Sequence, residues 1–369
     1  MGLSDIISLL GGVALFLFGM SLMGDGLKKV AGNRLELVLY KLSSTPLKGV
    51  LLGTGVTAVI QSSSATSVMV VGFVNSGMMK VKQAIGIVMG AILGTSITGW
   101  ILCLSDLSGG SGWVELLSTS TLTGIIAIVG IVIRMAGKKQ SSVHVGNILM
   151  GFAVLMFGMS SMSGAVAPLK ESEEFIRVLT SFSNPVLGIL VGAAITSILQ
   201  SASAAVGILQ ALAVTGAVSF GVSLPIIMGI AIGAAVPVLL SALGANLNGK
   251  RTAFVYLLID VLGALIWAVL FYGANAMVHF DFLDMPMTTV SIALMNTLFR
   301  LGTVIVLTPF IGLLEKLVCT IFPQRGEPAP GQREMDRLEH TGVAKSPALD
   351  AMLAQAGADP VAGSARLSD

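Results

Sequence analysis

The chain has 369 residues, of which 54% belong to the hydrophobic set and only 11% are charged, and its mean hydropathy is +0.91. Soluble domains carry roughly 25% charged residues, so the composition excludes this class and predicts an integral membrane protein. The net charge of +2 is too small to indicate a nucleic-acid partner.

Long apolar runs follow one another along the chain and predict membrane-spanning helices. A hydrocarbon core of about 30 Å needs about 20 apolar residues in a helix, and the runs lack the alternating pattern of a membrane β-barrel. The expected fold is therefore an all-α polytopic protein of the cell membrane, with about seven spans at 6–24, 83–104, 119–135, 145–166, 224–245, 253–278 and 288–315.

Two further segments, 46–77 and 185–216, are apolar but carry a polar string in the middle. The first string is "QSSSATS" at 61–67, and the second is "QSASA" at 200–204. On either side of its string each segment has roughly 15 residues, which reach about 22 Å as a helix and fall short of the membrane core. Each segment is therefore expected to form a re-entrant hairpin with the string at its tip.

An internal duplication relates the two hairpins. "GFAVLMFGMSSM" at 151–162 aligns with "GVALFLFGMSLM" at 12–23, and the same shift of 139 residues places Pro185 on Pro46, Gln200 on Gln61 and Gly216 on Gly77. A constant register through proline, glutamine and glycine indicates a repeat. We divide the chain into a first repeat (1–144), a second repeat with extra C-terminal spans (145–322) and a cytoplasmic tail expected to be disordered (323–369).

The parity of the spans predicts that the two repeats have opposite orientations. Three spans fill the first repeat, so the second must begin on the other side of the membrane. With the N-terminus outside, all Lys and Arg residues except Lys170, Arg177 and Arg300 fall in cytoplasmic loops or in the tail, as the positive-inside rule requires. The first hairpin then enters from the cytoplasm and the second from outside.

The polar strings are candidate binding sites, because broken helices at membrane depth usually line a substrate path. Free backbone N–H groups at a tip favour an anion, and hydroxyl groups can donate to it. The same oxygens can ligate sodium, for which we select Gln61, Ser64, Gln200 and Ser203. Close helix packing through small residues is the alternative. The candidate binding residues are Gln61, Ser62, Ser63, Ser64, Thr66, Gln200, Ser201 and Ser203.

The strings contain no Lys or Arg, so an anion bound there would need mobile cations to accompany it. Asp260 and Arg300 are the only charges expected well inside spans, and intramembrane charges are usually functional. A structural ion pair between the last two spans and a role in proton or ion coupling both stay open. No cofactor is expected, because Cys103, Cys319 and the three histidines show no metal-ligand spacing. An enzyme is not expected either, because no catalytic constellation is present.

The string "GTGVTAVIQSSSATS" at 53–67, with its echo "GAAITSILQSASAA" at 192–205, resembles the type II sodium-dependent phosphate cotransporter family, including bacterial members. The resemblance extends from residue 1 to about residue 320. It implies that the two tips form a shared binding region for phosphate and sodium. It also implies that the chain lacks a complete C-terminal PhoU-like domain, which bacterial members often carry.

Departures from the family pattern concentrate in the second repeat. Ala202 replaces a serine, and the family's GANIGTT-like turn reads "GAILGTS" at 90–96 and "GIAIGAA" at 229–235. Thr95, Ser96 and Thr98 remain candidate ligands at a helix break in the first repeat. The first tip is therefore expected to hold more of the ligands.

The resemblance favours sodium-coupled symport of inorganic phosphate by alternating access. The alternatives are transport of another small oxyanion, a different coupling ion, phosphate export, and a sensor that binds phosphate without transporting it. The lipid bilayer is an expected partner, and homo-oligomer formation is left open.

Overall fold

The computed structural model describes residues 3–31, 45–106, 119–137, 139–168 and 172–323. Within them nearly all elements are helices, and the residues up to Phe322 form one compact unit. The expected tail lies outside the described residues, except for Pro323. The first half contains α1 (Leu3–Ala31), α3 (Pro46–Ile60), α4 (Ser63–Asn75), α5 (Val81–Gly94), α6 (Ser96–Leu102), η1 (Cys103–Asp106) and α7 (Thr119–Ala136).

The second half begins with a helix that follows directly after α7. Its elements are α8 (Gln140–Val166), α9 (Glu173–Ser181), α10 (Pro185–Leu199), α11 (Ala202–Ala213), α12 (Phe220–Gly233), α13 (Ala235–Ser241), α14 (Leu247–Val278), η4 (Asp281–Asp284), α15 (Thr289–Leu307), η5 (Thr308–Phe310) and α16 (Ile311–Ile321).

Among the residues that the structure describes, six helical segments are long and apolar enough to cross a membrane, against the seven expected. The expected span at 119–135 is not among them, although these residues do form a helix, α7. Its apolar part, Ser120–Ala136, is among the shorter apolar helices, since about 17 residues reach only about 26 Å. A seventh candidate is the α9–α10 pair, which bends by 99° where Pro185 begins α10. The last expected span is interrupted by η5 at Pro309, because proline cannot continue the hydrogen bonding of a helix.

The duplication seen in the sequence recurs in the helices. The bounds of α10, α12 and α13 are those of α3, α5 and α6 shifted by 139 residues. Both α3 and α10 begin with proline in their first turn and end at a glutamine in the left-handed conformation. Both α4 and α11 begin after a serine whose side chain caps the helix. The same local structure is therefore built twice.

Glycines bring α3 and α5 into direct backbone contact. A Cβ atom at Gly86 would meet the carbonyl of Pro46, one at Gly53 that of Ile87, and one at Gly94 that of Thr54. Because the contacts advance together along both helices, α3 and α5 run in the same direction. The second half repeats this arrangement, with Gly192 against the carbonyl of Ile226 in α12.

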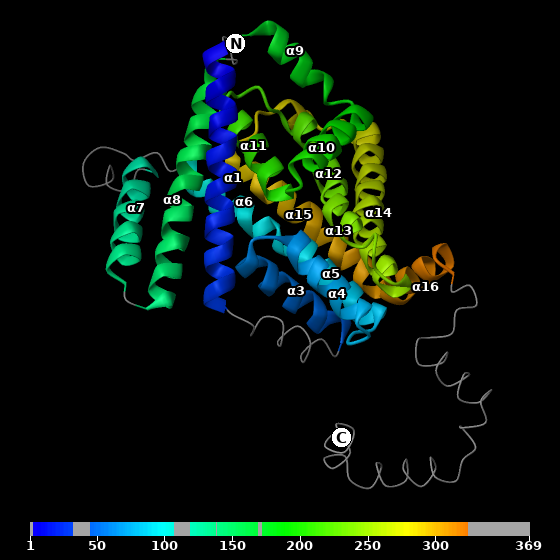
Figure 1. Cartoon of the computed structure of the whole chain (residues 1–369). Helices are drawn as coiled ribbons and strands as arrows, with labels where there is room; N and C mark the ends of the chain where they lie inside the picture. Colours follow the sequence, from blue (N-terminus) through cyan, green and yellow to red (C-terminus); the bar gives the residue numbers. More distant parts are fainter. Residues whose placement is uncertain (1–2, 32–44, 107–118, 138, 169–171, 324–369) are drawn as a thin grey trace, which may run out of the picture. The chain divides into compact units, whose positions relative to one another are not determined.

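The helices α1 and α8, which occupy equivalent places in the two halves, pack against each other in opposite directions. A Cβ atom at Gly12 would meet the backbone of Gly158, and one at Gly19 that of Gly151. Figure 1 shows the two helices side by side along their length, with α3 and α4 toward one end of α1 and α10 toward the other.

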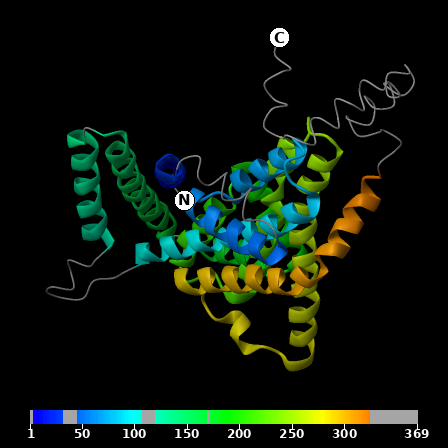
Figure 2. The ribbon, with the colours of Figure 1, turned by 90° about the horizontal axis from the view of Figure 1, so that it is seen from below.

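The short helices that follow the two polar strings each contact at least one element of the other half, besides elements of their own. Helix α4 contacts α13 and α14, and α11 contacts α6, α8 and α15. Helices α7 and α16 lie on opposite sides of this bundle, as both ribbon views show (Figure 2). The two strings are thus held where the halves of the chain meet.

Candidate functional site

The first string forms a two-residue break between α3 and α4. Gln61 adopts the left-handed conformation, with φ 59° and ψ 24°, and Ser62 is extended. The Ser62 Oγ accepts a 3.1 Å hydrogen bond from the backbone N–H of Ala65, which satisfies one of the free donors at the start of α4. A glutamine in the left-handed region costs about 1 to 2 kcal/mol, and such strained positions cluster at functional sites.

The Gln61 side chain is buried and links the break to the broken helix α5–α6. Its Oε1 accepts a 2.8 Å hydrogen bond from Oγ1 of Thr98 in α6, and its Nε2 donates to the carbonyl of Ala58. Thr98 follows the helix break at Thr95, the position expected from the "GTS" sequence. The sequence analysis predicted that Gln61 and residues of this break contribute to the binding site. The hydrogen bond from Thr98 connects the two in the structure.

The hydroxyl groups of the first string form further contacts. Oγ1 of Thr66 accepts a 3.0 Å hydrogen bond from Oγ1 of Thr57 and donates to the carbonyl of Ser62 at 3.1 Å. Oγ of Ser63 lies 3.0 Å from the hydroxyl of Tyr256 in α14. Ser64 is half-buried. The sequence interpretation missed Thr57 and Tyr256 as partners of the string, because nothing in their local sequence points to it.

The candidate ligands at the α5–α6 break are both buried but differ in their bonding. Oγ1 of Thr95 donates to the carbonyl of Ala91 at 3.2 Å. Oγ of Ser96 has no hydrogen-bond partner among the described residues. An unpaired buried hydroxyl normally costs free energy, so Ser96 is the more available of the two for a ligand.

The second string repeats the backbone of the first. Gln200 is left-handed, with φ 53° and ψ 25°, and Oγ of Ser201 accepts a 3.2 Å hydrogen bond from the N–H of Ala204. Ser201 is half-buried and Ser203 is buried, whereas Gln200 is exposed. Pro237 occupies the position equivalent to Thr98, so Gln200 cannot receive the hydroxyl donor that holds Gln61.

The loss of a threonine leaves a buried hydroxyl unpaired in the second half. Thr196 is the equivalent of Thr57, but Ala205 stands at the position of Thr66. Oγ1 of Thr196 is fully buried and has no partner among the described residues. The second tip therefore keeps its backbone geometry with fewer side-chain contacts.

Within the described residues, no hydrogen bond joins one string directly to the other. Gln210, a buried side chain of α11, is one of the residues that join the halves. Its Nε2 donates to the carbonyl of Gly99 in α6 at 3.2 Å and to that of Thr289 in α15 at 2.9 Å.

Asp260 and Arg300 are buried as expected and interact electrostatically. No direct ion pair joins them in the part of the chain that the structure describes. The Nε of Arg300 donates to Oδ1 of Asn296 at 3.0 Å, and its Nη1 donates to the carbonyl of Ile92 at 3.2 Å. The structure therefore places both charges behind the first tip without the direct contact of an ordinary ion pair.

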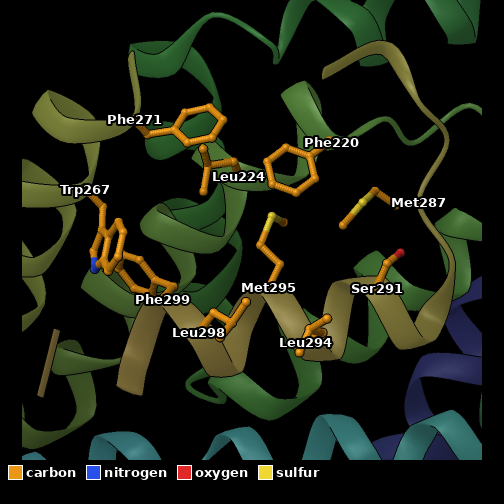
Figure 3. A pocket seen from close by; sticks show the side chains of 10 residues that line it. All are labelled: Phe220, Leu224, Trp267, Phe271, Met287, Ser291, Leu294, Met295, Leu298 and Phe299. Carbon is orange, nitrogen blue, oxygen red and sulfur yellow. The ribbon is translucent and has the colours of Figure 1, made fainter. Parts of the chain in front are cut away.

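An apolar cavity of about 220 Å³ lies between α12, α14 and α15 (Figure 3). Ser291 is the only lining residue with a hydroxyl group; the others are hydrophobic, among them Phe220, Trp267 and Met295. Such a lining cannot replace the hydration of an anion or of sodium. The polar tips, and not this cavity, are therefore the candidate ion site.

Comparison with known proteins gives one family and several relatives. The chain matches the family described as Na+/Pi-cotransporter over residues 15–164 and 168–314, which fall largely on the two halves. It is 27% identical to "Putative inorganic phosphate export protein YjbB" of Salmonella typhimurium, over 88% of this chain and 56% of the relative. It is 24% identical to "Uncharacterized protein YqeW" of Bacillus subtilis, over 87% and 99%.

A shorter stretch resembles an animal protein. "Sodium-dependent phosphate transport protein 2B" of Homo sapiens is 32% identical over 33% of this chain and 18% of its own length. The chain spans about half the length of the phosphate export proteins that it matches. No solved structure matches it significantly.

Proposed function

The chain belongs to the Na+/Pi-cotransporter family, and from this premise we propose that it is a sodium-coupled transporter of inorganic phosphate that works by alternating access around its two tips. The family consists of transporters, not enzymes, and the apolar helices are those of a multi-pass membrane protein. The substrate, the coupling ion and the direction of transport are the proposed part.

The observation that carries the proposal is the helix break that occurs twice at one offset. In each half a left-handed glutamine is followed by a serine that caps the next helix. Helices α4 and α11 direct the free N–H groups of their first turns toward these breaks, and such helix ends bind anions. We assign phosphate binding to the serines of the strings and sodium binding to Gln61, Ser64, Gln200 and Ser203.

Several contacts support a re-entrant hairpin in each half. Helices α3 and α5 run in the same direction, with Pro46 near Gly86. Because only 76–80 separate α4 from α5, α4 must return from the break toward the beginning of α3. The same reasoning applies to α10, α11 and α12. A hairpin of this size would enter the membrane and leave on the same side.

The opposite directions of α1 and α8 support inverted repeats. Residues related by the 139-residue shift lie in helices that pack head to tail. Inverted repeats are the common basis of alternating access, because the two halves can exchange conformations. In this arrangement the first hairpin faces the cytoplasm and the second faces the outside.

Charge balance supports sodium coupling. The strings contain neutral ligands, and moving one charge against 100 mV costs about 2.3 kcal/mol. Import of a divalent anion into a cell that is negative inside therefore costs about twice that amount, which inward sodium movement offsets.

The test is phosphate flux in proteoliposomes that contain the full chain. We expect uptake of radiolabelled phosphate that requires an inward sodium gradient, and no uptake with potassium in its place. Uptake driven by a proton gradient in the absence of sodium would show that protons, and not sodium ions, are the coupling ion. Phosphate binding without flux in either direction would exclude a transporter and favour a sensor.

Export is the second candidate, since relatives are named as phosphate export proteins. Release of phosphate from preloaded vesicles distinguishes export from import. If release depends on an outward sodium gradient while uptake under the inward gradient is absent, the protein acts as an exporter.

A further inference from the structure

A buried pair of opposite charges lies behind the first tip and has no part in the function proposed above. Asp260 in α14 is 1% exposed, and Arg300 in α15 is fully buried. Oδ2 of Asp260 and Nη2 of Arg300 have no hydrogen-bond partner among the described residues. The two side chains are close enough to interact electrostatically but not to form a direct ion pair.

The guanidinium group of Arg300 is fixed to one side of the first tip. Its Nη1 donates to the carbonyl of Ile92, three residues before the break at Thr95. The same broken helix carries Thr98, which holds the side chain of Gln61. Arg300 is thus attached to the element that positions the first glutamine.

Tyr256 connects Arg300 to the other side of the tip. Its hydroxyl lies 3.0 Å from Oγ of Ser63, the first residue of α4. Both Arg300 and Asp260 interact electrostatically with this tyrosine. The positive charge therefore lies one side chain away from the helix end to which we assign phosphate.

The bonding of Arg300 is incomplete for a buried charge. A guanidinium group has five N–H donors in a rigid fork. Nε and Nη1 of Arg300 donate hydrogen bonds, and the group also interacts with the Tyr256 hydroxyl, whereas Nη2 has no partner of hydrogen-bond geometry among the described residues. A structural arginine is normally satisfied by a bidentate carboxylate, and burying a charge without such contacts is costly. Asp260 is near but does not occupy the free donors. This arrangement suits an arginine whose additional partner is an anion that comes and goes.

We propose that Arg300 is a further anion-binding residue of the first tip, whose free Nη2 donates to bound phosphate, and that Asp260 balances its charge while the site is empty. The inference rests on the proposed function, since it assumes that phosphate binds at this tip. It would add a fixed positive charge from outside the strings, which themselves contain no Lys or Arg. Arg300 lies beyond the duplicated segments, so the second tip has no counterpart.

The experiment measures phosphate binding and uptake separately, using radiolabelled phosphate with the purified full chain and with proteoliposomes. We compare wild type with Arg300→Gln, Asp260→Asn and the double variant. Arg300→Gln is expected to weaken phosphate binding at least tenfold. Asp260→Asn is expected to bind phosphate as tightly as wild type or more tightly, because the positive charge then lacks its counter-ion.

The double variant decides between anion binding and a purely structural pair. It buries no uncompensated charge, so it is expected to fold even where a single variant does not. If Arg300 binds phosphate, the double variant stays at least tenfold weaker than wild type. Wild-type phosphate affinity in the folded double variant would overturn the inference.

Arg251→Gln is the matched control, since Arg251 is a buried arginine of α14 bonded to Asn248 and the carbonyl of Phe322. It is expected to lower thermal stability with unchanged phosphate affinity; an equal loss of affinity there would also contradict the inference. Measurements on wild type distinguish failure of the proposed function from failure of this inference. Wild type that binds phosphate without flux ends the transport proposal and leaves the Arg300 comparison decisive, whereas wild type that binds no phosphate ends both.

Discussion

Oγ1 of Thr98 donates a 2.8 Å hydrogen bond to Oε1 of Gln61, whereas the equivalent pair in the second half is Pro237 and Gln200, which cannot form it. The first glutamine is accordingly buried and the second exposed. Two breaks with the same backbone thus offer different side-chain environments, and the first is held more firmly.

Gln61→Gly is expected to abolish most transport while preserving the fold. Glycine adopts the left-handed conformation without strain, so this variant removes only the side chain. Gln61→Ala loses the same contacts but keeps a strained residue, and it should be less stable than the glycine variant by about 1 kcal/mol. Thermal unfolding in detergent and phosphate uptake measure the two effects. Gln200→Gly, with its exposed side chain, should reduce transport less; wild-type uptake in Gln61→Gly would make the side chain dispensable.

Gly53→Ala and Gly192→Ala are each expected to lower thermal stability by several degrees. A Cβ atom at these positions would overlap a backbone carbonyl of the parallel helix, namely Ile87 or Ile226, and overpacking costs about 1 to 3 kcal/mol. Gly55→Ala on the same helix is the control, because nothing lies within 4 Å of its added Cβ. It should be neutral or slightly stabilising, since alanine favours a helix by about 1 kcal/mol over glycine. Equal losses in all three variants would refute the packing argument.

Thr57→Val and Thr196→Val should change the melting temperature differently, although the two residues occupy equivalent positions in the repeats. Thr57 donates to Thr66 at 3.0 Å, whereas the Thr196 hydroxyl is buried without a partner. Removing one member of a buried hydrogen bond costs about 1 kcal/mol, and removing an unpaired hydroxyl does not. We expect a lower melting temperature for Thr57→Val and an unchanged or higher one for Thr196→Val. Identical shifts would show that both hydroxyls have equivalent surroundings.

The contact between Ser63 and Tyr256 should be measurable as a coupling between the first tip and α14. The variants Ser63→Ala and Tyr256→Phe each remove one side of a 3.0 Å hydrogen bond. If the bond contributes, the double variant loses less stability than the sum of the single variants, by about 1 kcal/mol. Thermal unfolding of the four proteins completes the cycle. Additive losses would mean that the two hydroxyls act independently.

Much of the fold follows from local sequence signals. Proline at 46 and 185 begins a helix, and the interrupted apolar runs at Gln61 and Gln200 end one, because these effects depend only on neighbouring residues. The number of spans does not follow in the same way, since the apolar part of α7 falls short of a full span, whereas Thr289–Ile321 remains one candidate span despite the break at Pro309. A helix whose length is close to the minimum for crossing the membrane core cannot be assigned as a span from its sequence pattern alone.

The partners of the candidate ligands could not be predicted in the same way. Gln61 meets Thr98, and Ser63 meets Tyr256, across 37 and 193 residues of sequence. A single tyrosine in an apolar helix has no periodic signal that marks it as a hydrogen-bond partner. The same holds for Gln210, whose two carbonyl acceptors lie on α6 and α15. Long-range packing, and not the motif, decides these contacts.

The seam between α1 and α8 has the form of a two-fold interface. Gly12 meets Gly158, and the residues that correspond to them under the repeat, Gly151 and Gly19, meet each other. This reciprocity is the mark of an isologous contact, as found between identical subunits of a symmetric dimer. A single ancestral half, inserted in both orientations, would already have possessed a surface complementary to itself.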